Sequence, residues 1–408
     1  MEAEQKTNIP VNGKKRYLSD LIYSILGLVV MNGVIQMVLY PYLNKQMGEE
    51  RFGDVLSLIS IVAIMGTTFG TAANYSRVVS TTKRKVENGD YNIFLTIIAV
   101  LSVIVSLATM LIMKDFTLWG YLGFSVLMIF TVLRYYADVE FRLNVNYKRF
   151  FIFYLFISIG YLLGVLVYPA TKSWIVTMLL GEIISVVYVL AVGKIFRGSY
   201  VQKSEDFKEN MKSVVLLSGT NLISALILNV DRLMLQYFEG GTAVTIFYTA
   251  TLVGKIVALV SGPLNGVIIG HLAKYKGGLP AKKFVGICGG ATLFGLIINV
   301  ACVAVSYVFV KLMYPDVFDM AKPYFWIANA GQVFYFISGT LTVILLRFTD
   351  EKYQLYINIA YLLAFLIFAF PMVISWGIWG MAIALLIVNL LRIILIAVMG
   401  IKLLKIGG

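Results

Sequence analysis

Five positively charged residues lie inside segments that are otherwise strongly apolar. They are Arg77, Arg134, Arg232, Lys255 and Arg392. A charged side chain at the centre of a lipid-facing helix costs roughly 2.5–3.5 kcal/mol, so such residues turn toward a partner or a hydrated interior. Guanidinium and ammonium groups in such an interior bind phosphate and pyrophosphate. We therefore expect a cationic cavity for an anionic substrate, with the substrate-binding residues Arg77, Arg134, Lys255 and Arg392.

Structural pairing is the alternative for these cations. Asp138 follows Arg134 by four residues, and Asp231 directly precedes Arg232. Residues four apart are neighbours on a helix, so either acid is a possible counter-ion. Lys255 and Arg392 have no acid within four residues, which favours the cavity for these two.

Two acids also lie inside apolar segments, and they suggest a coupling role. Glu182 stands near the middle of its segment and Asp231 in the outer third of its own. Each is either the partner of one of the cations or a group that binds a proton or Na⁺. We expect coupling or gating at Asp231, Arg232 and Glu182, with H⁺ or Na⁺ as the ion.

Residue patterns for enzymatic chemistry are weak. The chain has one histidine, His271, which makes a zinc or histidine-based catalytic centre improbable. The glycines at 286, 289 and 290 lack the Lys-Ser/Thr that completes a phosphate loop. We expect no catalytic residue, no metal and no cofactor, and therefore a protein that is not an enzyme.

Long apolar segments must position the charged residues. The chain has 408 residues, of which 60% are hydrophobic and 13% charged. Apolar runs of about 20 residues are typical of membrane-spanning helices. We predict an all-α integral membrane protein with twelve transmembrane helices. The spans are 18–43, 53–82, 91–113, 118–141, 149–168, 173–195, 212–238, 243–272, 283–310, 322–348, 353–374 and 378–402.

The basic residues alternate between the gaps that separate these spans. Gaps on one side, together with both termini, hold 23 of the 34 Lys and Arg residues, and gaps on the other side hold six. Loops rich in Lys and Arg stay in the cytoplasm, so we expect both termini there. The net charge of +13 is then a topology signal, and no nucleic acid partner is expected.

The longest internal polar gap divides the chain in the middle. We expect an N-terminal six-helix lobe at 1–195, a cytoplasmic linker at 196–211 and a C-terminal six-helix lobe at 212–408, around a central cavity. Six spans in each lobe give both lobes the same orientation, so any internal repeat is parallel.

Local motifs resemble one family of exporters. Residues 229–235 read NVDRLML and are followed by a glycine pair and by Tyr248-Thr249-Ala250, while 39–43 read LYPYL and precede Gly48-x-x-x-Phe52-Gly53. With the twelve spans, these features are similar to Wzx-type flippases of the multidrug/oligosaccharidyl-lipid/polysaccharide exporter superfamily. Asp231 and Arg232 match the motif directly, whereas the other charged residues are inferred from position.

This resemblance implies a function in the cell envelope. Wzx-type flippases move undecaprenyl-pyrophosphate-linked oligosaccharide repeat units across the bacterial cytoplasmic (inner) membrane by alternating access. The products are O-antigen, capsule or exopolysaccharide. Expected partners are the polyprenyl-pyrophosphate-linked glycan, membrane lipid, and the polysaccharide polymerase and chain-length proteins, with the chain itself a monomer.

Two other functions stay open from the sequence. A cation-coupled multidrug exporter of the same superfamily would favour an acid-lined cavity, whereas cations outnumber acids inside these spans. A membrane-embedded polysaccharide polymerase or glycosyltransferase needs a sizeable outer loop with acidic residues. The longest outer gap has only Asp316 and Asp319.

Overall fold

The chain folds almost entirely into helices. The computed structural model describes residues 11–197, 200–259, 265, 268, 272, 277–350 and 352–404, and these ranges contain no strand. Eleven helical segments among them are long and apolar enough to span a membrane. The last, Lys352–Leu403, contains non-helical backbone at Gly377 and covers the last two predicted spans. The predicted all-α membrane protein with twelve spans is therefore confirmed.

Two compact units make up the chain. The first comprises Met1–Tyr42 and Ile61–Ala225, and the second comprises Leu43–Ser60 and Leu226–Gly408. Their three boundaries lie inside helices, not in the polar gap at 196–211. These helices are Tyr40–Met47, Glu49–Met65 and Phe207–Glu239. The first unit thus includes the first half of the helix that starts at Phe207.

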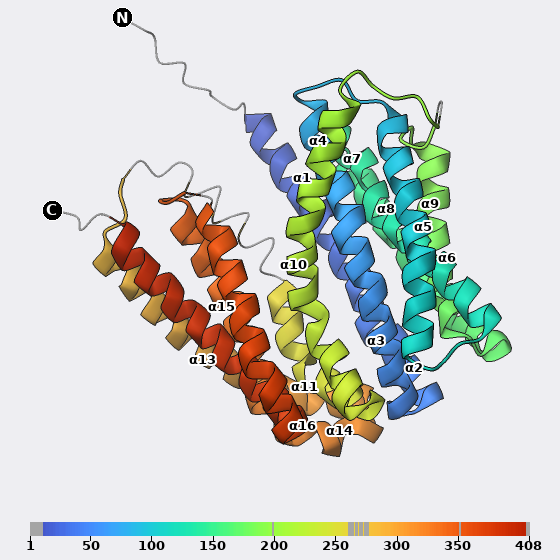
Figure 1. Ribbon diagram of the computed structural model, residues 1–408. Helices are drawn as coiled ribbons and strands as arrows, with labels where there is room; N and C mark the ends of the chain where they lie inside the picture. Colours follow the sequence, from blue (N-terminus) through green and yellow to red (C-terminus); the bar gives the residue numbers. More distant parts are fainter. Residues whose placement is uncertain are drawn as a thin grey trace, which may run out of the picture. The chain divides into compact units, whose positions relative to one another are not determined.

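Figure 1 shows the helices of the first unit and those that it shares with the second. They are α1 (Val11–Val34), the π-helix η1 (Ile35–Leu39), α2 (Tyr40–Met47), α3 (Glu49–Met65), the π-helix η2 (Gly66–Gly70), α4 (Thr71–Thr81), α5 (Asn88–Ile112), α6 (Leu118–Ala137), α7 (Val139–Leu143), α8 (Tyr147–Thr171), α9 (Trp174–Val192) and α10 (Phe207–Glu239). The helix pairs that pack together include α8 with α9, α1 with α8, α6 with α9, and α5 with α6.

The second unit continues with further described helices, several of them long. They are α11 (Gly241–Leu259), α13 (Ala281–Met313), α14 (Pro315–Ala321), the short 3₁₀-helix η3 (Lys322–Tyr324), α15 (Phe325–Leu346) and α16 (Lys352–Leu403). The predicted span 243–272 corresponds to α11, and its second half, with His271, lies largely outside the described residues.

Close helix contact at η2 depends on two glycines. A Cβ atom at Gly66 would lie 2.5 Å from the Tyr135 ring, and one at Gly70 would lie 2.6 Å from the carbonyl oxygen of Val132. The absence of side chains therefore lets η2 approach α6. One turn further along, the amide of Asn74 donates to the carbonyl oxygens of Tyr135 and Tyr136 at 3.2 and 3.3 Å. The two helices are thus joined by both packing and hydrogen bonds.

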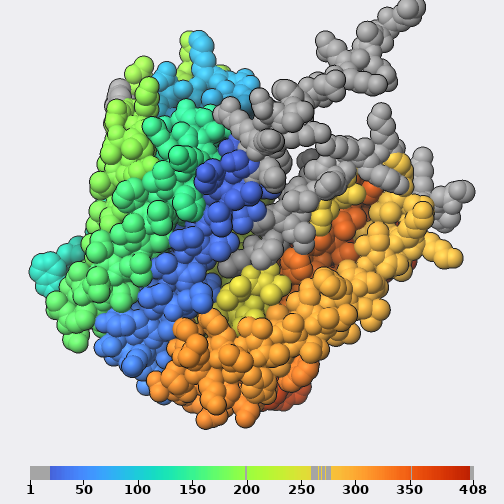
Figure 2. All heavy atoms as spheres, turned by 180° about the vertical axis from the view of Figure 1, so that it is seen from behind, coloured from blue at the N-terminus to red at the C-terminus, as the bar shows by residue number. Residues whose placement is uncertain are grey.

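In the second unit, a sharp turn separates the two halves of α16. Gly377 has φ 53° and ψ −126°, a conformation that side chains disfavour. The chain can therefore reverse there and α16 forms two spans. On α13, several large apolar side chains are exposed, including Leu293, Ile297 and Val308 at 65–70%. Figure 2 shows α13 (yellow-orange) at the surface, as expected for a helix that faces lipid.

The segment between α9 and α10 is fastened to the first unit. The buried Asp90 carboxylate accepts hydrogen bonds from the Ser204 amide at 2.8 Å, the Ser204 hydroxyl at 2.6 Å and the Asn210 amide at 3.0 Å. The Glu140 carboxylate accepts from the amides of Lys194 and Ile195 at 2.8 and 3.0 Å. The described residues of this segment, 194–197 and 200–206, therefore form a strap on this unit.

We predict that Asp90→Ala loosens this strap. The change removes the acceptor of the half-buried Ser204 amide and hydroxyl and one of the acceptors of the buried Asn210 amide, and an unsatisfied donor of this kind destabilises a protein by about 1–3 kcal/mol. Thermal unfolding of the purified protein in detergent measures this. Glu205→Ala is the control, since its ion pair with Lys85 is exposed and is expected to contribute nothing measurable. Equal stability of the Asp90 variant and the original chain would contradict the strap.

Candidate functional site

In the second unit, an ion pair joins two successive helices. The Lys255 ammonium on α11 lies 2.9 Å from Oδ2 of Asp231 on α10. The Lys255 side chain is 17% exposed and that of Asp231 is 5% exposed. Oδ1 of Asp231 accepts the backbone N–H of Arg232 at 2.9 Å. Both carboxylate oxygens of Asp231 are thus engaged.

Arg232 therefore gains no side-chain partner from its neighbour in sequence. Its Nη1 donates to the Ser60 hydroxyl at 3.2 Å, and its guanidinium carbon lies 5.3 Å from the centre of the Tyr248 ring. Its Nε is buried without a hydrogen-bond partner among the described residues. Within those residues no carboxylate lies in ion-pair range of Arg232. A hydroxyl and an aromatic face therefore stabilise its guanidinium.

Arg392 is held in a similar way on the second half of α16. Its guanidinium carbon lies 5.7 Å from the Tyr335 ring and 5.1 Å from the Tyr361 ring. Nη2 donates to the amide oxygen of Asn358 at 3.3 Å, whereas the buried Nε has no partner in the described part of the chain. No ion pair involves Arg392 within the described residues.

These groups give the second unit a local excess of positive charge. Asp231 binds the Lys255 ammonium and the backbone N–H of Arg232, and Arg392 adds a third cation on α16 of the same unit. Within the described residues, only Lys255 among these three cations forms an ion pair. Guanidinium groups that retain an unbonded N–H in a poorly solvated interior are suited to a phosphate or pyrophosphate ligand.

The first unit uses its central cation differently. Nε of Arg134 lies 2.6 Å from Oε2 of Glu182, and the Tyr161 hydroxyl donates to Oε1 of Glu182 at 2.7 Å. The Arg134 guanidinium carbon lies 4.4 Å from the centre of the Tyr135 ring. Both charged side chains of this ion pair are buried, at 9% and 1% exposure. Glu182 thus neutralises Arg134 across α6 and α9.

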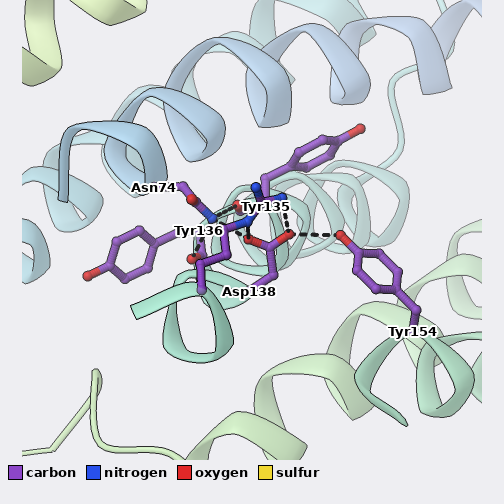
Figure 3. Close-up of polar contacts among 6 residues, drawn as sticks. Asn74, Tyr135, Tyr136, Asp138 and Tyr154 are labelled. Atoms are coloured by element: carbon purple, nitrogen blue, oxygen red, sulfur yellow. Dashed lines mark hydrogen bonds and ion pairs between the residues drawn. The ribbon is translucent and has the colours of Figure 1, made fainter. Parts of the chain in front are cut away.

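Asp138 is not the counter-ion of Arg134, which corrects one alternative from the sequence. Its carboxylate binds the Arg142 guanidinium at 2.9 and 3.2 Å and accepts the Tyr154 hydroxyl at 2.9 Å. It also accepts a hydrogen bond from the Asn74 amide (Figure 3). Helix α6 ends at Ala137, just before Asp138, and Asp138 therefore bonds to α4, α7 and α8. Similarly, Asp231 pairs with Lys255 and not with Arg232.

Arg77 lies in a third environment, near the strap. Its guanidinium donates to the Tyr136 hydroxyl and to the amide oxygen of Asn88, and it is 7% exposed. Asn88 in turn donates to the carbonyl oxygens of Lys194 and Arg197 at 2.9 and 2.6 Å. The surroundings of Arg77 therefore position the start of α5 and the strap, and its role in substrate binding stays a prediction.

The structure thus separates the seven predicted site residues into three groups. Arg232, Asp231, Lys255 and Arg392 belong to the second unit; Arg134 and Glu182 pair in the first; Arg77 stands apart from that pair. Sequence reasoning missed the aromatic and amide residues around Arg392, which are Tyr335, Asn358 and Tyr361. The sequence feature that could have identified these residues is the presence of their polar side chains in apolar spans.

Comparisons with solved structures identify the fold. The lipid II flippase MurJ in an inward closed conformation has a TM-score of 0.72 and 14% identity, with 95% of this chain and 87% of that chain covered. An inward-facing multidrug resistance MATE family transporter of the MOP superfamily has a TM-score of 0.60 and 13% identity, with 95% and 97% covered. The Vibrio cholerae MATE transporter VcmN in the bent form has a TM-score of 0.58 and 14% identity, with the same coverage.

Comparisons with known sequences identify no family for this chain. No family model and no curated protein matches the chain. At 13–14% identity, the likeness to these structures shows the fold, and function has to be argued from the site. The chain is a multi-pass membrane protein with the fold of a lipid II flippase and of MATE transporters.

We predict that the Arg134–Glu182 pair is a stability element. Glu182→Leu leaves a buried, unpaired guanidinium and is expected to cost about 3–5 kcal/mol, whereas the combined Arg134→Leu and Glu182→Leu variant recovers most of that loss. Thermal unfolding in detergent of Glu182→Leu, Arg134→Leu and the double variant gives the coupling energy. A coupling energy near zero would count against the pair.

Proposed function

We propose that this chain is a flippase that moves undecaprenyl-pyrophosphate-linked oligosaccharide repeat units across the bacterial cytoplasmic membrane, for O-antigen, capsule or exopolysaccharide. The observation that carries the proposal is the cation group of the second unit, which consists of Arg232, Lys255 and Arg392 and of which only Lys255 forms an ion pair within the described residues. Its fold, which resembles that of a lipid II flippase, also supports transport of a lipid-linked substrate.

In this proposal the pyrophosphate is attracted by Arg392, Arg232 and Lys255. Each contact between opposite charges at 4 Å contributes about 4 kcal/mol at an effective dielectric constant near 20, before desolvation. Arg392 offers an N–H group without a present partner, so binding there breaks no ion pair. Lys255 can exchange Asp231 for phosphate, which makes their ion pair the element that responds to substrate. In the same proposal, Arg77 and Arg134 bind this substrate from the first lobe.

The remaining parts of the proposal concern the transport cycle. Alternating access of two lobes, 1–195 and 212–408, carries the head group while the polyprenyl tail stays in lipid. Asp231, Arg232 and Glu182 couple or gate the cycle, with H⁺ or Na⁺ as the ion. Both termini lie in the cytoplasm, and the chain works as a monomer beside the polysaccharide polymerase and chain-length proteins.

Export of drugs is the second candidate, because MATE transporters share the fold. Cationic drugs favour a site with an excess of negative charge, whereas Asp231 and Glu182 are each matched by a cation. A strain that lacks the chain separates the two functions. Loss of surface polysaccharide with unchanged drug susceptibility supports the flippase. Raised susceptibility to cationic drugs with normal polysaccharide supports the exporter.

We predict that Arg392→Ala reduces surface polysaccharide in that strain when the variant replaces the original chain. Loss of a charged hydrogen bond to the pyrophosphate slows transport by about tenfold or more. Arg392→Lys retains the charge and part of the activity. Lys402→Ala removes an exposed cation from the same helix and is expected to behave like the original chain.

A reconstituted assay gives the rate directly. Liposomes that contain the purified chain receive a fluorescent undecaprenyl-pyrophosphate-linked oligosaccharide, and an impermeant reductant bleaches the outer leaflet over time. Unchanged bleaching and unchanged polysaccharide in Arg392→Ala, at normal protein levels, would refute the role of the cation group.

A further inference from the structure

A small cleft opens between α5 and α6 in the first unit. Its volume is ≈ 200 Å³, which is below the roughly 300–1,000 Å³ of pockets for small molecules. Its lining residues are Leu95, Thr96, Ala99, Ile129, Val132, Leu133 and Tyr200. Six of them come from α5 and α6, and Tyr200 comes from the strap. Its small volume and mostly apolar lining suit part of a single hydrocarbon chain.

Hydrogen bonds within the cleft satisfy its polar groups. The Thr96 hydroxyl donates to the carbonyl oxygen of Asn92 at 2.8 Å. Its proton is thus used, and the Tyr200 hydroxyl is the donor in their mutual hydrogen bond, also at 2.8 Å. This bond fixes the Tyr200 ring against α5. The walls therefore present hydrocarbon to an occupant and leave it no buried polar group to bind.

The neighbouring surface leads from the cleft into lipid. Ile97, Val100 and Ile104 on α5 are each 59–60% exposed. In a multi-pass membrane protein, such a continuous apolar helix face contacts acyl chains. A tyrosine at the edge of this face is typical of the interface between hydrocarbon and head groups. A membrane lipid can therefore reach the cleft without crossing water.

Two cations flank Tyr200, three residues away on either side. Arg197 donates to the carbonyl oxygens of Leu190 and Ala191 at 3.2 and 3.1 Å, and the Lys203 ammonium lies 4.8 Å from the Phe207 ring centre. Both side chains belong to exposed residues, and neither forms an ion pair within the described residues. Basic residues at this level of a membrane attract anionic head groups.

We propose that this cleft binds an anionic membrane phospholipid. One acyl chain occupies the space between α5 and α6, and the phosphodiester lies beside Tyr200, where Arg197 and Lys203 hold it. Since Tyr200 belongs to the strap, the bound lipid ties the strap to α5. The site thus takes a structural lipid, which is distinct from the substrate of the cation group in the second unit.

Native mass spectrometry of the purified full chain tests the proposal. The chain is titrated in detergent with phosphatidylglycerol and with phosphatidylcholine of the same acyl chains. The combined variant Arg197→Gln and Lys203→Gln is expected to bind phosphatidylglycerol about 30-fold more weakly, which corresponds to about 1 kcal/mol for each charge. Its binding of phosphatidylcholine stays the same.

Two further variants complete the design. Ala99→Phe fills the cleft and is expected to abolish the tight binding of one phosphatidylglycerol molecule, with thermal unfolding as the check that the variant is folded. Lys282→Gln with Lys283→Gln removes two exposed cations at the start of α13 and leaves binding unchanged.

Three results would overturn the proposal. They are unchanged phosphatidylglycerol binding in the variant of Arg197 and Lys203, an equal loss in the α13 control, and displacement of phosphatidylglycerol by equimolar undecaprenyl phosphate. The last would assign the cleft to the polyprenyl carrier. The charge variant lies at exposed positions, so the proposal stays testable even if Ala99→Phe does not fold.

Discussion

The cost of a charge inside an apolar bundle is the constraint on which this structure depends. An ionised side chain that leaves water loses several kcal/mol unless a partner or a polar surface meets it. In the first unit, buried acids meet cations or backbone amides. Glu182 holds Arg134, Asp138 holds Arg142, and Asp90 and Glu140 hold the strap. The buried charged side chains of this unit therefore serve largely to join its helices.

The second unit solves the same problem with fewer carboxylates. Lys255 has Asp231, whereas Arg232 and Arg392 lie near tyrosine rings and a hydroxyl or amide oxygen. An aromatic face stabilises a partly desolvated cation by about 0.5–2 kcal/mol. This is less than a buried carboxylate can provide. The local field consequently stays positive, and the two units differ in what they can bind.

The sequence predicted the helices well because membrane spans are a property of composition. A run of about 20 apolar residues with basic flanks needs no information from the rest of the chain. The break at Gly377 lies in the gap between the last two predicted spans. The sequence does not show that Asp90 and Glu140 hold the segment between α9 and α10 on the first unit. These contacts join residues more than 50 positions apart.

Partner choice was the part that the sequence could not supply. Asp138 is four residues from both Arg134 and Arg142, so spacing alone cannot decide between them. Tertiary structure decides, because α6 ends at Ala137 and the facing side chain on α9 is Glu182. The tyrosines around Arg392 could not be predicted for the same reason. Tyr335 and Tyr361 are 57 and 31 residues away from it, and only folding brings them together.

An arginine between tyrosines is better suited to transient binding than an arginine in a salt bridge. A carboxylate that holds the guanidinium competes with an incoming phosphate, and its own charge repels the ligand. A ring face has no net charge and occupies no N–H group of the guanidinium. Arg392 can therefore accept an anion while it keeps its aromatic contacts, and the anion can leave without exposing an unpaired acid. A site that must both bind and release its ligand requires this balance.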